Sequence, residues 1–261
     1  MLTANDMKYA RLFLLLVLCS CSTASRVSKD VSGKDGYSPV MGAVTTIQTT
    51  VPEVSGLCPA PAGDGMLAAS DESGVYHVSW TGATTEFFKN HMDCEGVTID
   101  PATKDVYYIV ERRQEVRRLK APDYKDSELL TTIKDVGYRT NSGLEGITFY
   151  KDGLVLVGNQ EKPVLLMCYS PKEDKMLWQK ELTFTSEIAD LCYDPVRDVL
   201  WVADSERHEF YLCTLEGTVL NTYPMPDIDN GEGLFVDHTN SCIWIGDDTT
   251  SKVYKISFEG L

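Results

Sequence analysis

The sequence lacks the short signatures of several common catalytic and metal-binding classes. None of its eight cysteines forms a CxxC pair, which argues against a structural zinc site. It has no GxSxG nucleophile elbow, no HExxH helix and no phosphate-binding P-loop. These absences exclude the usual sequence patterns of serine hydrolases, zinc proteases and P-loop nucleotide hydrolases.

Positive charge, long apolar runs and helical periodicity are also scarce. The chain has 24 Lys and Arg against 39 Asp and Glu, giving a formal net charge of −15, whereas nucleic-acid binding needs a basic surface. The apolar run Leu12 to Cys19 is far shorter than the roughly 20 residues that span a bilayer. The near absence of a 3.6-residue period favours an all-β fold.

The N-terminus has the pattern of a secretory signal, predicted over residues 1–20. Lys8 and Arg11 precede the apolar run, and small polar residues follow it. The segment Leu18 to Cys21 resembles the lipobox of bacterial lipoproteins, with Leu18 three residues before Cys21 and Ser20 just before it. The resemblance implies acylation of Cys21 and anchoring in the cell envelope, with the outer membrane as the expected location. A plain secretory signal with two incidental cysteines is the alternative.

After Cys21 the chain is rich in Ser, Lys, Gly and Asp, which predicts a flexible tether over residues 21–40. The folded domain is expected over residues 41–261. Its six cysteines show no spacing that identifies a disulfide pair, and four of them lie in apolar strand-like segments: Cys168, Cys192, Cys213 and Cys242. We therefore expect mostly free, buried thiols.

One phrase occurs five times along the chain. Its copies align Gly56, Gly96, Gly146, Asp190 and Gly233, at steps of 40, 50, 44 and 43 residues. Each copy predicts a short strand, a turn such as "DPATKD" or "DPVRD", and two more strands, and a fourth strand follows in four copies. Strand-rich repeats of 40 to 50 residues are typical of β-propeller blades.

The fifth copy ends without a fourth strand, and the strand-like segment Ala43 to Thr50 has no place in any copy. Because an open sheet edge promotes aggregation, we expect this segment to complete the last blade. The sequence therefore predicts an all-β, five-bladed β-propeller closed by an N-terminal strand, with a six-bladed ring as the alternative. Trp201 and Trp244, at matching second-strand positions, are predicted to lie in the core between blades.

Acids and amides occur where the first strand of a blade begins and where the second ends. Both places lie on one face of a propeller, because the two strands are antiparallel. At the first-strand starts, Glu95, Glu145, Asp190 and Glu232 are predicted to bind a ligand. At the second-strand ends, the predicted metal ligands are Asp71, Glu111, Asn159, Asp204 and Asp247.

Converging carboxylates repel one another unless they take up protons or bind a cation. Oxygen ligands without His or Cys favour Ca²⁺ or Mg²⁺. A second interpretation makes the repeated Glu structural, with each Glu bonding nearby backbone N–H groups. Each Gly that follows Glu is expected to let neighbouring backbones crowd at the axis.

The phrases "CEGVTID", "LEGITFY", "WVADSE", "GEGLFVD" and "IWIGDD" resemble the SdiA-regulated family of exported bacterial propellers, with related repeats in NHL propellers and phytase-like proteins. The resemblance covers about residues 51–258 and implies a propeller fold and a cell-envelope location. The chain departs from the pattern at Ser55, which replaces Glu, and at "IAD" around Asp190. These departures break the symmetry of the ring where a ligand would bind.

Three functions compete at this stage, and no catalytic residue is assigned. The first is a monomeric, lipid-anchored propeller that binds a small ligand or a partner at the acidic face, through Ca²⁺ if one is bound. The second is a metal-dependent hydrolase of the lactonase or esterase type at the same site, with His91 or His208 as the nearest histidine bases. The third is a protein-interaction scaffold.

Overall fold

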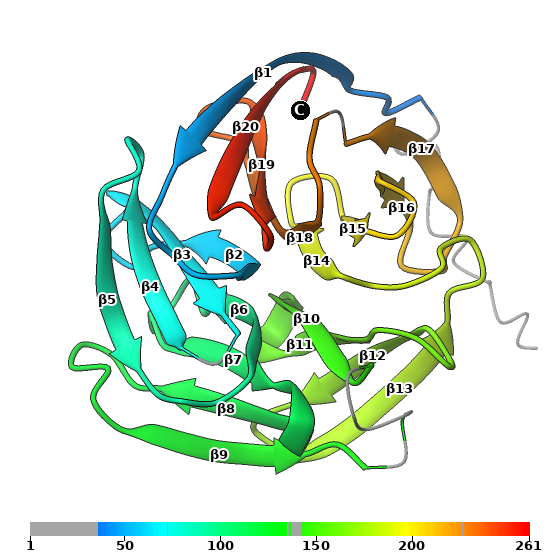
Figure 1. Ribbon diagram of the computed structural model, residues 1–261. Helices are drawn as coiled ribbons and strands as arrows, with labels where there is room; N and C mark the ends of the chain where they lie inside the picture. The colour runs from blue at the N-terminus through cyan, green and yellow to red at the C-terminus, as the bar shows by residue number, and fades with distance from the viewer. Residues whose placement is uncertain (1–35, 72, 135, 137–141, 226) are drawn as a thin grey trace, which may run out of the picture.

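The protein is a five-bladed β-propeller in the computed structural model, which describes residues 36–71, 73–134, 136, 142–225 and 227–261. Its described strands form five antiparallel four-stranded sheets arranged around a central channel (Figure 1). The predicted fold class is confirmed. The predicted signal peptide, Cys21 and most of the tether lie outside the described residues.

The blades follow one another along the chain. Blade 1 comprises β2 (Val54–Pro59), β3 (Gly65–Ser70), β4 (Gly74–Ser79) and β5 (Thr84–Lys89), and blade 2 comprises β6 (Cys94–Ile99), β7 (Val106–Val110), β8 (Glu115–Leu119) and β9 (Ser127–Thr132). Blade 3 comprises β10 (Leu144–Phe149), β11 (Val155–Asn159), β12 (Leu165–Ser170) and β13 (Lys175–Glu181), and blade 4 comprises β14 (Asp190–Asp194), β15 (Val199–Asp204), β16 (Glu209–Cys213) and β17 (Val219–Pro224). Blade 5 comprises β18 (Gly231–Asp237), β19 (Cys242–Asp247), β20 (Lys252–Glu259) and the N-terminal β1 (Val40–Gln48), and two single-turn 3-10 segments lie at Glu111–Arg113 and Lys151–Gly153.

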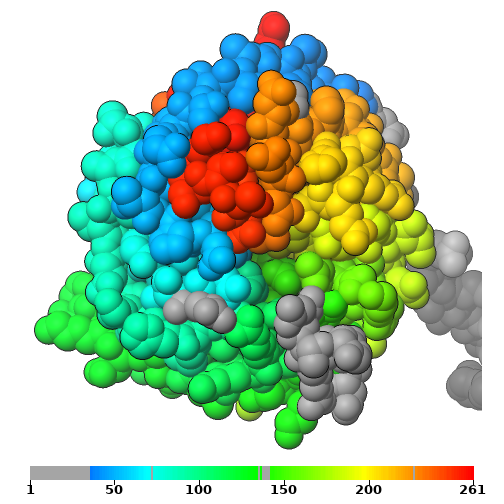
Figure 2. All heavy atoms as spheres, viewed as in Figure 1, coloured from blue at the N-terminus to red at the C-terminus, as the bar shows by residue number. Residues whose placement is uncertain are grey.

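The N-terminal strand closes the ring, as the sequence predicted. β1 pairs antiparallel with β20, from Val40 opposite Glu259 to Gln48 opposite Lys252. In Figure 2 the blue N-terminal segment lies directly against the red C-terminal one. Gln48, the last residue of β1, lies opposite Lys252, which lies opposite Asp247, which in turn lies opposite Gly231 at the start of the inner strand. β1 therefore finishes on the face where the inner strands begin, and it begins on the face where they end.

The core lies between neighbouring blades. Trp201 is fully buried and stacks on Tyr223 of its own blade, and it meets Phe258 of blade 5 edge-on. Trp244 is 5.5 Å, centroid to centroid, from Trp80, which follows β4 of blade 1. The prediction that both tryptophans lie in the core between blades is confirmed. All six cysteines of the described chain are free, and all except half-buried Cys192 are buried.

Aspartate side chains shape the turns between the first and second strands. The Asp100 Oδ1 atom accepts a hydrogen bond from Ala102 N at 2.8 Å, and Asp194 Oδ1 accepts one from Val196 N at 2.9 Å. Such bonds to the backbone two residues on are the usual way in which Asp stabilises a turn. The Asp-Pro phrases therefore form the turns between strands that the sequence predicted.

The Glu-Gly pairs are sites of irregular strand pairing. The ladder between first and second strands shifts register across them, between Cys94 and Val97 in blade 2 and between Leu144 and Ile147 in blade 3, and similar shifts occur in blades 1 and 5. β-Bulges re-aim side chains and are common beside functional sites. A Cβ on Gly96 would lie 2.3 Å from the Glu145 carbonyl oxygen, so the inner strands approach too closely for any other residue.

Candidate functional site

An acidic pocket of about 180 Å³ lies at the channel mouth where the inner strands begin. Its walls carry seven carboxylic acids and one arginine. The lining residues are Ser55, Asp71, Asp93, Glu95, Glu111, Arg112, Glu145, Gln160, Glu232 and Asp248. The structure thus brings together five of the nine predicted site residues: Asp71, Glu95, Glu111, Glu145 and Glu232.

Three carboxylates lie close enough to share one cation. Asp71, Asp93 and Glu95 each offer an oxygen within 4.8 Å of the other two. Asp93 is 5% exposed, and its Oδ2 atom accepts a bond from Arg112 N at 3.0 Å and lies 3.3 Å from Arg112 Nε. Its Oδ1 atom is buried without a hydrogen-bond partner in the described part of the chain. A buried oxygen without a donor is expected to require one, or a cation.

The bulge glutamates are held in a setting that disfavours their charge. Burial, and after it the charge of Glu232, raises the pKa of Glu95 well above its usual range. Burial and the neighbouring Glu95 do the same to the pKa of Glu145. Burial and Asp248 raise the pKa of Glu232 to about 8. Without a cation, the pocket therefore favours the protonated form of these side chains more than water does.

The other acids of the pocket have partners that hold them in place. Glu111 accepts a hydrogen bond from Gly143 N at 2.7 Å, which links blade 2 to the segment before β10. Asn230 donates to Glu232 at 2.8 Å and to Asp248 at 3.4 Å. These bonds fix where the carboxylates point, so the pocket is a built arrangement rather than a set of free surface acids.

Three predicted metal ligands, Asn159, Asp204 and Asp247, do not line the pocket. Asn159 is buried and donates to the carbonyls of Glu161 and Pro163. Asp204 accepts bonds from Thr185 and Ser186, and Asp247 Oδ1 accepts from Thr249 N and Thr250 N. Each is the last residue of its second strand, whereas Asp71 and Glu111 come just after theirs.

A shift of one residue turns a side chain to the opposite side of a strand. At the second-strand ends of blades 3 and 5, the residues that face the pocket are therefore the next ones, Gln160 and Asp248; the corresponding residue of blade 4, Ser205, does not line it. The sequence alignment missed this because it matched residue types instead of positions relative to the strand end. Asp93 was missed too, although its i,i+2 spacing from Glu95 is the signal that places two side chains on one side of an extended segment.

Asp190, predicted to bind a ligand, does not line the acidic pocket. It occupies the place that Gly has in the other blades, and blade 4 has no register shift there. Its carboxylate accepts hydrogen bonds from Leu191 N and Leu234 N, both at 2.8 Å, and from Leu57 N at 3.4 Å. Burial raises the pKa of Asp190, and these N–H donors oppose that effect. The side chain links blades 1, 4 and 5 across the channel.

The two histidines considered as bases are exposed and do not line the acidic pocket. His208 lies in the turn after β15, and His91 lies two residues before Asp93. Glu187, which the sequence analysis did not single out, lies near the pocket: Gln160 Nε2 donates to its Oε2 atom at 3.3 Å. Burial raises the pKa of Glu187 as well.

A family model described as SdiA-regulated matches residues 167–260, which run from the third strand of blade 3 to the end of blade 5. The resemblance seen in the sequence phrases is thus confirmed over this part of the chain. No curated protein matches the sequence. Among the described residues, no helix is long and apolar enough to cross a bilayer.

Several solved structures share the fold at low sequence identity. The glutaminyl cyclase of Myxococcus xanthus has a TM-score of 0.64 at 12% identity, covering 85% of this chain and 97% of that one. A gluconolactonase from Xanthomonas campestris has a TM-score of 0.58 at 12% identity, with coverage of 85% and 95%. An auxiliary nutrient binding protein from Bacteroides thetaiotaomicron has a TM-score of 0.53 at 16% identity; the match covers 82% of this chain but only 61% of that protein. These likenesses show the propeller fold.

Proposed function

We propose that the protein is a lipid-anchored propeller of the cell envelope that binds a divalent cation, Ca²⁺ before Mg²⁺, in the acidic pocket and holds a small ligand or a partner there. The observation that carries this proposal is the group Asp71, Asp93 and Glu95, whose oxygens lie within 4.8 Å of one another. An all-oxygen set with several carboxylates suits a hard cation that accepts six to eight ligands.

Electrostatics supports a bound cation. Seven acids meet one arginine in the pocket, and the pKa of Glu232 is raised to about 8. A divalent ion offsets the repulsion that otherwise favours protonation of these acids. Ser55, Gln160 and the carboxylates not bound to the cation would then give a ligand hydrogen-bonding groups on an asymmetric wall.

The direct test is a calcium titration of the purified protein by calorimetry and thermal melting. We expect saturable binding and a melting temperature that rises with Ca²⁺ concentration, since an ion that binds only the native state stabilises it. Glu95→Gln should weaken binding at least tenfold. Glu86→Gln, which changes an exposed glutamate of β5, is the matched control and should leave binding unchanged. Equal binding in both variants would exclude the acidic pocket as the site.

The lipid anchor rests on the lipobox resemblance at Leu18 to Cys21. The chain enters the propeller on the face opposite the acidic pocket, where Arg197 lies 4.8 Å from the Tyr37 ring and Tyr223 donates to the Pro39 carbonyl at 2.7 Å. An anchor at Cys21 therefore leaves the acidic pocket clear of the attachment point. Cys21→Ser should move the protein from the membrane fraction to the soluble fraction, whereas Cys19→Ser should not; the same distribution for both variants would contradict lipidation of Cys21.

A metal-dependent hydrolase is the second candidate, because Glu145 and Glu232 lie in the same pocket as the candidate cation ligands. A carboxylate beside a metal-bound water can serve as its general base. The gluconolactonase with the same fold makes lactones the first substrates to assay. We expect any lactone hydrolysis to require the cation and to be lost in Glu95→Gln; hydrolysis that persists in this variant would place the chemistry elsewhere.

A further inference from the structure

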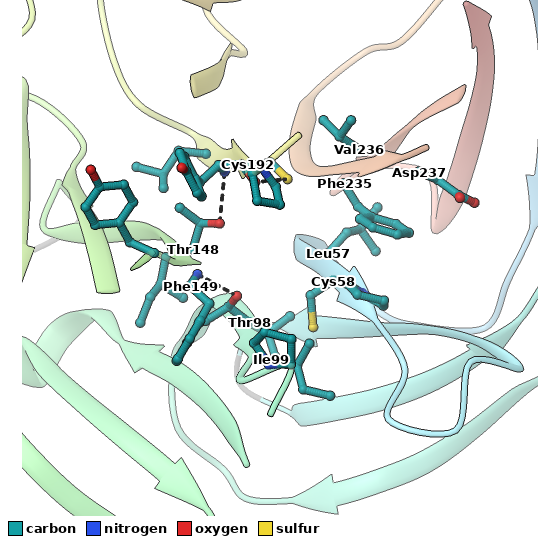
Figure 3. Close-up of a pocket in the computed structure, with 18 of the residues that line it drawn as sticks. Leu57, Cys58, Thr98, Ile99, Thr148, Phe149, Cys192, Phe235, Val236 and Asp237 are labelled. Carbon is teal, nitrogen blue, oxygen red and sulfur yellow. Dashed lines mark hydrogen bonds between the residues drawn. The ribbon is translucent and has the colours of Figure 1, made fainter. Parts of the chain in front are cut away.

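A second, larger cavity of about 570 Å³ lies at the other channel mouth, where the inner strands end. All five inner strands contribute to its wall, and Figure 3 shows Leu57, Ile99, Phe149, Cys192 and Phe235 around the same space. Its volume falls in the range of roughly 300–1,000 Å³ that is usual for small-molecule pockets. The cavity is large enough for a ligand of about drug size.

The apolar cavity is distinct from the acidic pocket, with which it has no lining residue in common. Leu57, Ile147 and Leu191 line the apolar cavity, while Ser55 and Glu145, two residues before Leu57 and Ile147, line the acidic pocket. The Asp190 carboxylate, bonded to Leu57 N, Leu191 N and Leu234 N, lies at the level between them. This side chain thus lies between the two cavities and lines neither of them.

Three of the four charged side chains that line the cavity are paired within the protein, and the fourth, Asp152, lies exposed at the rim turn. Lys151 Nζ lies 2.6 Å from Asp198, and His238 Nε2 lies 2.8 Å from Asp194. Asp237 accepts hydrogen bonds from the turn that follows it and from Trp244. A charged ligand inside the cavity would have no buried counter-charge to replace its hydration, which is unfavourable, and exposed Asp152 can offer only a water-screened one.

Two hydroxyl groups in the wall still have a hydrogen to donate. Thr98 Oγ1 accepts a bond from Phe149 N, and Thr148 Oγ1 accepts one from Tyr193 N, both at 3.0 Å (Figure 3). Neither hydroxyl donates to an acceptor among the described residues, and both threonines are 6% exposed. A buried hydroxyl without an acceptor favours a ligand that supplies one.

We infer that the apolar cavity binds an uncharged, mainly apolar small molecule that carries a hydrogen-bond acceptor such as a carbonyl oxygen. The apolar part of the ligand fills the space between the inner strand ends, and its acceptor meets Thr98 or Thr148. The two thiols of the wall fit this setting, because burial raises the pKa of Cys192 to about 12 and that of Cys58 well above its usual range, so both stay neutral. Binding there is independent of the cation proposed for the acidic pocket.

The test uses Nile red, an uncharged aromatic ketone, as the fluorescent probe with the purified full chain, and 2-alkanones as competitors. We expect one saturable site with blue-shifted emission, unchanged by Ca²⁺ or by a chelator. Each methylene added between 2-hexanone and 2-decanone should tighten competition about fourfold until the cavity is full. Non-saturating emission, or competition that does not depend on chain length, would overturn the proposal.

Two substitutions locate the site. Cys192→Phe adds bulk at a half-buried wall position and should weaken probe binding at least tenfold, while Leu177→Phe on the exposed strand β13 should leave it unchanged. Thr148→Val should weaken 2-decanone binding about threefold to tenfold, and Thr148→Ser should retain it. Thr98→Val and Thr98→Ser form the same comparison for the other hydroxyl. If Cys192→Phe does not fold, these two pairs decide; equal 2-decanone affinity within both the Thr148 pair and the Thr98 pair would contradict the assigned hydrogen bond.

Discussion

The Asp190 carboxylate accepts a hydrogen bond from Leu234 N at 2.8 Å. This bond joins the inner strand of blade 4, which carries Asp190, to the inner strand of blade 5, which carries Leu234. The same carboxylate bonds Leu191 N and Leu57 N, so one side chain satisfies donors from three blades. It replaces the glycine of the repeat and separates an acidic mouth from an apolar one. The residue that breaks the repeat thus stabilises the centre of the ring.

Replacing this carboxylate should destabilise the protein more than any exposed acid does. In Asp190→Gly, which restores the repeat, buried N–H groups lose their acceptor at about 1–3 kcal/mol each. We expect the free energy of unfolding, measured by denaturant titration, to fall by about 3 kcal/mol or more. Asp152→Asn, at an exposed turn, is the control and should change it by less than about 0.5 kcal/mol. A stable Asp190→Gly variant would show that the network does not hold the ring together.

The adjacent residues Asp247 and Asp248 should have separable roles. Asp247 is fully buried and bonds the turn after β19, so Asp247→Asn should lower the melting temperature by about 3–6 °C while the folded variant keeps its calcium affinity. Asp248 lines the acidic pocket, so Asp248→Asn should weaken calcium binding severalfold and leave the melting temperature of the calcium-free protein unchanged or higher. Calorimetry and thermal melting of the two variants give both readouts. The reverse pattern would contradict the register that we assign to blade 5.

Stability of the calcium-free protein should fall as the pH rises. The pKa of Glu232 is raised from 4.5 to about 8, so between these values the native state holds a proton that the unfolded state has lost. The contribution of Glu232 to the free energy of unfolding is therefore fully present below pH 4.5. It declines by at most about 1.4 kcal/mol per pH unit between pH 4.5 and pH 8. Glu232→Gln should flatten the decline, measured as the free energy of unfolding at several pH values. A profile identical to that of the unmodified protein would mean that Glu232 is ionised throughout.

Removal of β1 should open the ring. A chain that begins after Gln48 leaves β20 as an unpaired edge strand, since β1 pairs with β20 along its whole length. We expect lower thermal stability and association into dimers or aggregates, seen by size-exclusion chromatography. A chain that begins at Gly36 keeps β1 and should behave as the full-length domain does. A stable monomer without β1 would show that blade 5 holds with three strands.

The sequence predicted the fold well because each blade repeats local signals. Alternating apolar residues, Asp-bearing turns and the spacing of the Glu-Gly phrase identify strands and blade number, and the missing fourth strand identifies β1. The acidic face was also predictable, since Glu95, Glu145 and Glu232 occupy the same place in the repeated Glu-Gly phrase. The structure places all three at register shifts between the first and second strands. These features depend on residues close together in the chain.

The remaining features of the two cavities were not predictable from the sequence. They depend on where each side chain lies along its strand, to within one residue, and on contacts between blades. Asn159, Asp204 and Asp247 carry the right chemistry but point away from the pocket, because side chains alternate along a strand. The position of Asp190 across the axis follows from how closely the Gly146 backbone approaches it, since a Cβ on Gly146 would lie 3.0 Å from Asp190 Cα, and spacing alone does not give this. The apolar cavity has no polar signature and arises only when five strand ends converge.

The most direct test of the central claim is the number of protons released when calcium binds at pH 7. It is measured by calorimetry in buffers of different ionisation enthalpy. Because burial raises the pKa values of Glu95, Glu145 and Glu232, cation binding must displace protons from the pocket. We predict saturable binding with release of about one proton or more, reduced in Glu232→Gln. Binding without proton release, or no binding of Ca²⁺ or Mg²⁺ at all, would contradict the assignment of the acidic pocket as a cation site.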